Sequence, residues 1–145
     1  MKVQSLGHVV LRVSNLERAE AFYSGILGLP VCARYPERQM VFFSLGDHHD
    51  FAIASVGEDA PPAAGNTAGL AHVAFRLGDD LEILRKAKAD LEAAGVTVQR
   101  IVDHEVSKSI YVNDPDGNGI EVYVDGSDIW KTEPQRVAQA QPLAL

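Results

Sequence analysis

Short apolar runs alternate with breaks rich in glycine, proline and polar residues along most of the chain, and their order predicts a mixed α+β fold. The first cycle opens with an apolar strand at residues 6–13. Apolar residues at helical spacing follow, and Gly28 marks the end of that helix. Ser14 or Asn15 is the expected N-cap, and Glu17 would complete a capping box with Ser14. Three more strands complete the cycle, at residues 31–35, 40–45 and 51–56.

The same order of elements returns after a linker at residues 57–68, which is rich in glycine, proline and alanine. An apolar strand at residues 70–77 opens the second cycle. An amphipathic helix follows, and Gly95 ends it. Three strands come next, and the residues between the last two are dense in turn-forming types, including Pro115. These three strands are predicted at residues 96–102, 109–112 and 120–124.

The two cycles are also related residue by residue, which indicates an internal repeat. Leu-Gly-His-Val-Val-Leu-Arg-Val at residues 6–13 matches Leu-Ala-His-Val-Ala-Phe-Arg-Leu at residues 70–77, so His8 and His72 are equivalent. The later hairpins align without gaps at an offset of 68, which places Ile53 opposite Glu121. We therefore expect one domain over residues 1–127, with a tail at 128–145. Its parts would be module one (1–60), the linker (57–68) and module two (69–127).

Length, composition and charge narrow the class of protein. The chain has 145 residues, 46% of them hydrophobic, which suits one soluble domain. No apolar run is long enough to span a membrane, and the N-terminus lacks the pattern of a signal peptide. The single cysteine, Cys32, fits a cytoplasmic setting and is expected to be a small buried residue. The net charge of −7 argues against nucleic-acid binding.

Glu121 is out of place in an apolar strand, because Ile120 and Val122 flank it. A carboxylate on a buried face is costly unless it meets a cation or a strong donor, so an inward Glu121 would indicate a metal. An outward glutamate on an edge strand is the alternative, and this stretch alone leaves both open. His8, His72 and Glu121 together would form the two-imidazole, one-carboxylate set that suits Fe(II), while Mn(II), Zn(II) or Ni(II) could also bind.

With these features the chain resembles the vicinal oxygen chelate superfamily, which includes glyoxalase I, bleomycin-resistance proteins and type I extradiol catechol dioxygenases. The resemblance covers about residues 5–125, with the repeat, the helix end Phe-Tyr-Ser-Gly-Ile-Leu-Gly-Leu at 22–29 and the hairpin Asp-Pro-Asp-Gly-Asn-Gly-Ile-Glu at 114–121. It implies two βαβββ modules that form a half-open, metal-centred barrel. It also implies that His8, His72 and Glu121 are the metal ligands.

Within that superfamily the chain looks closest to the single-domain extradiol dioxygenases. Glyoxalase I takes a further ligand, usually Glu, from the last strand of its first module, and this chain has Ile53 there. The resemblance assigns His49 as a base near the oxygen site and Tyr111 as a hydrogen-bond partner of the substrate. His104 would be the second histidine around the site, although its spacing to Tyr111 is shorter than in the two-domain members. His48 could be a loop residue without a role.

The resemblance therefore implies an enzyme that cleaves the ring of a catechol beside its diol, with Fe(II) and dioxygen, and with His49, His104 and Tyr111 as catalytic residues. A homodimer is expected, with no nucleic-acid or membrane partner. Two alternatives stay open: a metal-dependent lyase or isomerase of the glyoxalase type, and a non-catalytic resistance protein that binds a drug. The first needs a fourth protein ligand, and the second needs no metal.

Overall fold

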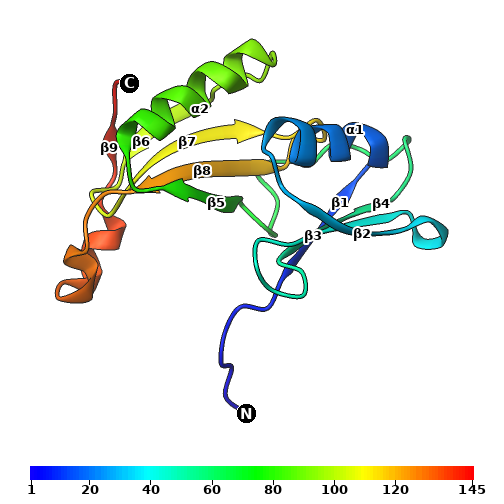
Figure 1. Ribbon diagram of the computed structural model, residues 1–145, viewed down its shortest axis with the longest axis horizontal. Helices are drawn as coiled ribbons and strands as arrows, with labels where there is room; N and C mark the ends of the chain where they lie inside the picture. The colour runs from blue at the N-terminus through cyan, green and yellow to red at the C-terminus, as the bar shows by residue number, and fades with distance from the viewer. The chain divides into compact units, whose positions relative to one another are not determined.

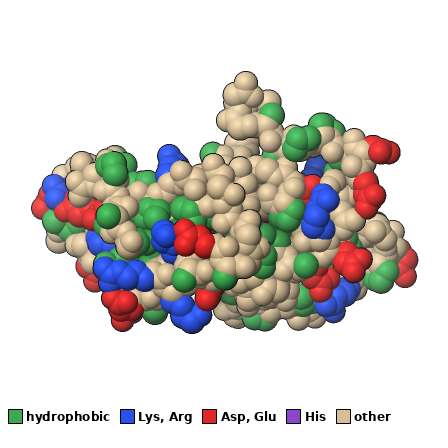
Figure 2. Space-filling view, turned by 90° about the horizontal axis from the view of Figure 1, so that it is seen from above, with side chains coloured by type: hydrophobic (Ala, Val, Ile, Leu, Met, Phe, Trp, Pro, Cys, Tyr) green, Lys and Arg blue, Asp and Glu red, His purple; other side chains and the backbone are tan.

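Each predicted cycle of strands forms a sheet of its own in the computed structural model, which describes all of residues 1–145 (Figure 1). The chain divides into two units, Met1–Ala63 and Ala64–Leu145. None of its helices has the length and apolar character needed to cross a membrane. Charged side chains of both signs are interspersed over the face seen in Figure 2.

The first unit is a four-stranded sheet with a helical segment against it. Its strands lie in the order β1-β4-β3-β2; β1 and β4 run parallel, and the other pairs are antiparallel. Aromatic rings join the helical segment to the sheet, since Tyr23 packs on Phe43 and Phe51. The elements are β1 (Val9–Val13), α1 (Leu16–Glu20), the π-helix η1 (Ala21–Ile26), β2 (Val31–Tyr35), the 3-10 helix η2 (Pro36–Arg38), β3 (Met40–Phe43) and β4 (Phe51–Ser55).

Three local expectations for this unit need correction. Of the two expected N-caps, Asn15 is confirmed, because its side-chain oxygen accepts from the Arg18 amide at 2.8 Å. Ser14 is buried, and its hydroxyl accepts from the Arg18 guanidinium, so it forms no capping box. The helix also changes from α to π after Glu20. Cys32 is exposed, because it lies on β2, the outer strand of the sheet.

The second unit is a five-stranded sheet in the order β5-β8-β7-β6-β9. Helix α2 lies along one face of it (Figure 1), where Leu84 and Leu91 are buried. Asp80 caps α2 by accepting from the Glu82 amide at 2.9 Å. The elements are β5 (Val73–Gly78), α2 (Leu81–Ala93), β6 (Arg100–Asp103), β7 (Ser107–Asn113), β8 (Gly119–Asp125), the 3-10 helices η3 (Ile129–Lys131) and η4 (Pro134–Ala138), and β9 (Gln141–Pro142).

The predicted α+β class and the two βαβββ modules are therefore confirmed, because each unit begins with a strand, a helical segment and three strands, and β9 of the tail is added to the second sheet. The half-open barrel concerns how the modules pair, and it stays a prediction. In the second unit, residues of β7 and β8 alternate between the two sides of the sheet. Those on one side form the apolar core with α2: Ile110, Val112, Ile120, Val122 and Val124.

The strand registers correct the alignment of the two hairpins by one residue. Val10 pairs with Ala52 in the first unit, while Ala74, at the equivalent place, pairs with Glu121 in the second. Ala52, not Ile53, therefore corresponds to Glu121. A shift of one residue moves a side chain to the other face of a sheet. Ile53 accordingly lies on the same face as Phe51, which packs under the helical segment, and it is fully buried.

Candidate metal and catalytic site

Glu121 lies in the middle of its sheet, because β8 is flanked by β5 and β7. It is buried, with 7% of its surface exposed, so an outward glutamate on an edge strand is wrong. The Ser109 hydroxyl donates to its Oε1 at 2.6 Å, and its Oε2 lies 3.0 Å from Nε2 of His72. One carboxylate oxygen is thus held by the protein, and the other meets an imidazole.

His72 is placed by a close approach of two backbones. It comes directly before β5, and its side chain is 38% exposed. Gly119, at the start of β8, lies against it. A Cβ atom at residue 119 would come within 2.4 Å of the Ala71 carbonyl oxygen and 3.2 Å of the His72 Cβ. Glycine is therefore needed there for the strand to run beside His72.

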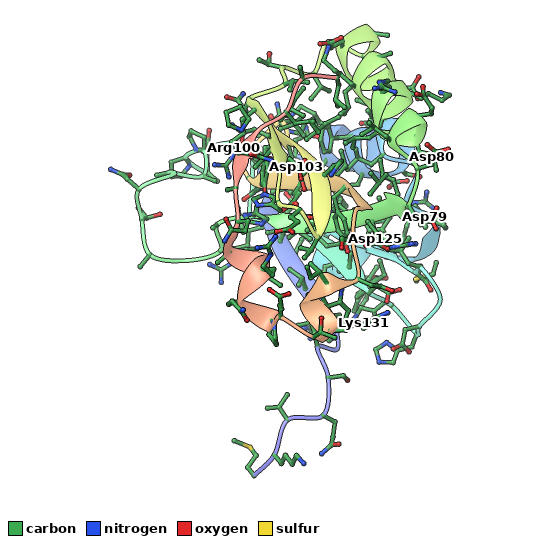
Figure 3. All side chains as sticks on the ribbon, turned by 90° about the vertical axis from the view of Figure 1, so that its left-hand side faces the viewer. Asp79, Asp80, Arg100, Asp103, Asp125 and Lys131 are labelled. Atoms are coloured by element: carbon green, nitrogen blue, oxygen red, sulfur yellow. The ribbon has the colours of Figure 1, made fainter.

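Tyr111 stands between the carboxylate and a cation. It pairs with Glu121 on one side and with Arg100 on the other. The Arg100 guanidinium carbon lies 4.0 Å from the centre of its ring, and Figure 3 shows Arg100 on β6. The edge of the Tyr111 ring meets His72, with 5.5 Å between ring centres. Burial raises the pKa of Tyr111 to about 12, and the charge of Glu121 adds to that shift while Arg100 opposes it.

The hydroxyl of Tyr111 lies 2.9 Å from Nε2 of His104. The other ring nitrogen of His104, Nδ1, lies 2.8 Å from the carbonyl oxygen of Gln139. His104 follows the end of β6, and its amide donates to the Ser107 carbonyl across the turn into β7. The imidazole therefore has a protein partner at both nitrogens.

A cluster of imidazoles lies in the first unit. His8 comes directly before β1, and its ring centre is 4.2 Å from that of His49 in the loop before β4. The Nδ1 atoms of His48 and His49 are 2.8 Å apart, and the Phe42 ring packs edge-on against His49. Desolvation lowers the pKa of His49, and the neighbouring imidazoles lower it further.

The structure thus brings the predicted site residues together in two groups. His72, Glu121, Tyr111 and His104 form one network in the second unit, and His8 contacts His49 in the first. No three His, Cys, Asp or Glu side chains of the chain are grouped so that they could hold a metal ion. The three-ligand set of His8, His72 and Glu121 therefore stays a prediction.

The residues present nevertheless fit a divalent metal of the expected kind. An imidazole nitrogen and a buried carboxylate oxygen already face each other, and these are donor atoms that Fe(II), Mn(II), Zn(II) and Ni(II) accept. The Ser109 hydroxyl fixes the carboxylate in the way that outer partners orient metal ligands.

Sequence reasoning missed three groups in this network: Ser109, Arg100 and the Gln139 carbonyl. Ser109 precedes Tyr111 by two residues in a strand, so the alternation of side chains would have placed both on one face. Arg100 could have been found in the same way once the register of β6 was known. The Gln139 carbonyl has no sequence signature, because every residue carries that acceptor.

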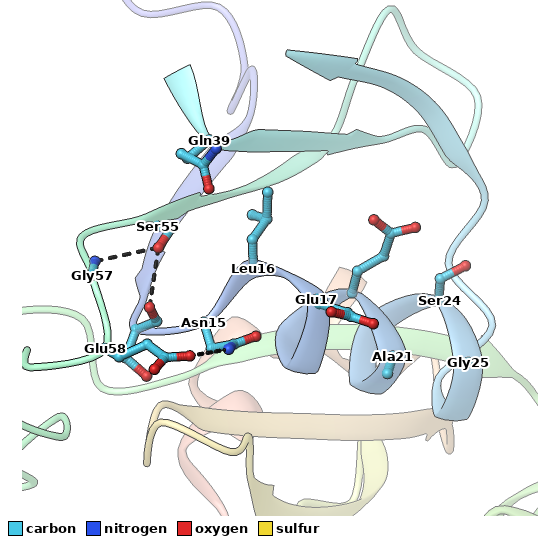
Figure 4. Close-up of a pocket in the computed structure, with 12 residues that line it drawn as sticks. Asn15, Leu16, Glu17, Ala21, Ser24, Gly25, Gln39, Ser55, Gly57 and Glu58 are labelled. Atoms are coloured by element: carbon cyan, nitrogen blue, oxygen red, sulfur yellow. Dashed lines mark hydrogen bonds between the residues drawn. The ribbon is translucent and has the colours of Figure 1, made fainter. Parts of the chain in front are cut away.

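The first unit also contains a cavity of about 870 Å³, which Figure 4 shows. No predicted site residue lines it. Its polar wall groups partly satisfy one another, since Asn15 donates to Glu58 at 2.6 Å and the Gly57 amide donates to the Ser55 hydroxyl.

Comparison with known proteins gives the family. Residues 5–122 match the Glyoxalase/Bleomycin resistance protein/Dioxygenase superfamily, and the chain belongs to it. A solved structure, a glyoxalase/dioxygenase from Nostoc punctiforme, superimposes with a TM-score of 0.70 at 19% identity, over 86% of this chain and 92% of that one. The fold is therefore the fold of this superfamily.

The curated relatives are mostly enzymes of several kinds. A catechol-2,3-dioxygenase of Bacillus subtilis (strain 168) is 34% identical to this chain. The match covers 83% of this chain but only 41% of that protein. A lactoylglutathione lyase of Neisseria meningitidis is 30% identical over 79% of this chain and 86% of its own length. Other relatives include biphenyl-2,3-diol dioxygenases and a glutathione transferase. Similarity alone leaves the reaction open.

Proposed function

We propose that this protein is an extradiol ring-cleaving dioxygenase that acts on a catechol, with Fe(II) held by His8, His72 and Glu121. The observation that carries the proposal is the network in the second unit. A buried carboxylate faces an imidazole, and Tyr111 on the adjacent strand contacts His104 in the turn before that strand. This set offers metal ligands and proton-handling groups side by side, as oxidation of a diol requires.

Iron would supply the Lewis acidity that favours loss of the diol protons and the redox chemistry that lets dioxygen attack the ring carbon beside the diol. The chain's own residues would handle the protons. Tyr111 is protonated at neutral pH, since its pKa is raised to about 12, so its hydroxyl can hydrogen-bond a substrate oxygen. His104 stands behind it as a proton acceptor. His49 would serve as the base, and its lowered pKa favours the neutral form that this role needs.

Anaerobic loading with Fe(II), followed by exposure to simple, alkyl and aryl catechols in oxygenated buffer, tests this function. We expect one dioxygen consumed for each catechol cleaved, together with a yellow ring-fission product. Protein stripped of metal by a chelator is the control. Iron-loaded protein that binds catechols but consumes no dioxygen across the panel would exclude the proposal. Light scattering on the same sample would test the expected homodimer.

One observation favours a second candidate, a glyoxalase-type lyase: the chain spans 86% of the Neisseria lyase but only 41% of the Bacillus dioxygenase. The first module argues against it, because the position equivalent to Glu121 is Ala52 and β4 contains no carboxylate. Isomerisation of a glutathione hemithioacetal by the Ni(II) or Zn(II) form, without catechol cleavage by the Fe(II) form, would favour the lyase.

A further inference from the structure

The C-terminal tail, residues 126–145, folds back onto the second sheet, although it lies beyond the residues that match the superfamily. Strand β9 pairs with β6, and the Leu143 amide donates to the Ile101 carbonyl at 3.1 Å. Arg136 forms an ion pair with Glu105 at the turn between β6 and β7. The tail is therefore attached on both sides of Gln139.

Gln139 is held in place within this tail. It follows η4, and its amide donates to the Arg136 carbonyl at 3.2 Å. Its own carbonyl oxygen lies 2.8 Å from Nδ1 of His104. A carbonyl can only accept a hydrogen bond, so Nδ1 of His104 must carry the proton. In a neutral imidazole the proton on Nδ1 leaves Nε2 with a free lone pair.

Whether Nε2 of His104 carries a proton decides which group donates the hydrogen bond between His104 and the Tyr111 hydroxyl. Nε2 lies 2.9 Å from the Tyr111 oxygen, so with a lone pair it can accept the phenol proton in competition with the Glu121 carboxylate. The Tyr111 oxygen then keeps its lone pairs for a group on its other side. With the opposite tautomer, His104 would donate to Tyr111, and Tyr111 would have to donate onward.

We propose that the tail, through the Gln139 carbonyl, is a positioning element that fixes the tautomer of His104 and thereby makes Tyr111 a hydrogen-bond acceptor toward the substrate. The consequence of this positioning for catalysis rests on the proposed function. A substrate hydroxyl would give its proton to the Tyr111 oxygen while the Tyr111 proton moves to Nε2 of His104. One O–H bond breaks in the substrate, Tyr111 stays neutral, and the Gln139 carbonyl stabilises the imidazolium.

Nitrogen-15 NMR of the imidazole rings reads the tautomer directly, without metal or substrate. The His104 signals are assigned by their loss in His104→Gln. We compare the full chain with a chain that ends at Ala138 and so lacks the Gln139 carbonyl. A chain that ends at Pro142 is the matched control, because it keeps both Gln139 and β9. Amide spectra of β7 and β8 check that each variant is folded, and dilute samples limit self-association.

In the full chain and the control, His104 should be the Nδ1–H tautomer. In the chain that ends at Ala138, the population should shift toward Nε2–H, and ring cleavage should slow by about 10- to 100-fold, as for other outer partners of a site. An Nε2–H form in the full chain, or the same tautomer after truncation, would overturn the inference. If the tautomer shifts as expected but no catechol is cleaved by any form, the proposed function fails and the positioning role stands.

Discussion

The two sheets place different chemistry on the same backbone. At equivalent register positions, one row of side chains crosses each sheet, and it is Val10–Ala52–Phe42–Ala33 in the first unit and Ala74–Glu121–Tyr111–Arg100 in the second. The first row is entirely apolar. The second carries an acid, a phenol and a guanidinium. The pairing of these strands is the same in both sheets, so three side chains account for the difference in charge between the two rows.

The two equivalent histidines, His8 and His72, also differ in the groups that they contact. His8 and His72 each come directly before the first strand of their module. His72 meets a carboxylate at 3.0 Å, whereas His8 stacks on another imidazole, His49. One module thus places its histidine against a carboxylate, and the other places its histidine against a second imidazole. Substitutions at these positions test whether the difference determines metal binding and activity.

The largest effect should come from removing the acid of the second row. Glu121→Ala gives the second module the residue that Ala52 provides in the first. Without an anionic ligand, two imidazoles should not retain a divalent cation, and metal content should fall from about one ion per chain to background. Elemental analysis after gel filtration measures this. Glu105→Ala, in the turn before β7, is the control, and a metal-replete Glu121→Ala protein would refute the ligand set.

The base of the first module is tested by His49→Ala. Iron binding should be unchanged, while turnover should fall by about 10²- to 10⁴-fold, as expected for loss of a proton-transfer group. Steady-state oxygen uptake with iron-loaded protein measures the loss. His48→Ala, which removes the adjacent imidazole, should keep most of the activity. Equal activity of wild type and His49→Ala would remove His49 from the mechanism without touching the ligand set.

Ser109→Ala removes the hydroxyl that holds Oε1 of Glu121 at 2.6 Å. The carboxylate should then lose its orientation, and metal affinity should fall by about 10- to 100-fold. Competition with a coloured chelator gives the affinity. Ser107→Ala, two residues away on the same strand, removes the same hydroxyl group at a position that pairs with Asp125. Similar affinities for both variants would show that Ser109 does not orient the ligand.

Gly119→Ala tests the close approach that places His72. The new Cβ would lie 2.4 Å from a backbone oxygen, so β5 and β8 must move apart. We expect a loss of about 2 kcal/mol in the free energy of unfolding, in the range for overpacked sites. Urea denaturation measures it. Gly7→Ala, where a Cβ would meet nothing within 4 Å, is the control. If both variants unfolded alike, the approach of the two strands would not require glycine.

The smallest effect is confined to high pH. The pKa of Tyr111 is raised from 10.0 to about 12 in the folded state, so folding favours the protonated phenol. The resulting stability is complete below pH 10 and disappears as the pH rises toward 12. Tyr111→Phe introduces the residue found at the equivalent position of the first row, Phe42. Between pH 10 and pH 12 this variant should lose less stability than the wild type. Urea midpoints at both pH values measure this, and equal losses would mean that the pKa of Tyr111 is not raised.

The pattern of apolar residues predicted nearly every strand and both main helices, because periodicity reports burial directly. It could not fix the register of the hairpins. Ala52 and Ile53 are both apolar, so an alignment shifted by one residue looks equally good, yet it exchanges the two faces of the sheet. In either register, the position of the first module that is equivalent to Glu121 carries no carboxylate.

The residues of the candidate site also differ in whether residue type alone could identify them. Glu121 stood out because a charge in an apolar strand needs a partner. Ser109 and Arg100 became recognisable only with the register, since their importance lies in which face they occupy. The link between Gln139 and His104 joins a backbone atom to a side chain 35 positions away, and such contacts leave no trace in residue type.

Strand β9 has one more consequence, for the behaviour of the protein in solution. Without it, β6 would be the outermost strand of its sheet, with free amide and carbonyl groups that can pair with another chain. The two residues Gln141–Pro142 occupy part of this edge, and Pro142 has no amide proton to offer a further strand. Because a covered edge offers fewer groups for pairing with another chain, we expect the tail to reduce aggregation at high concentration.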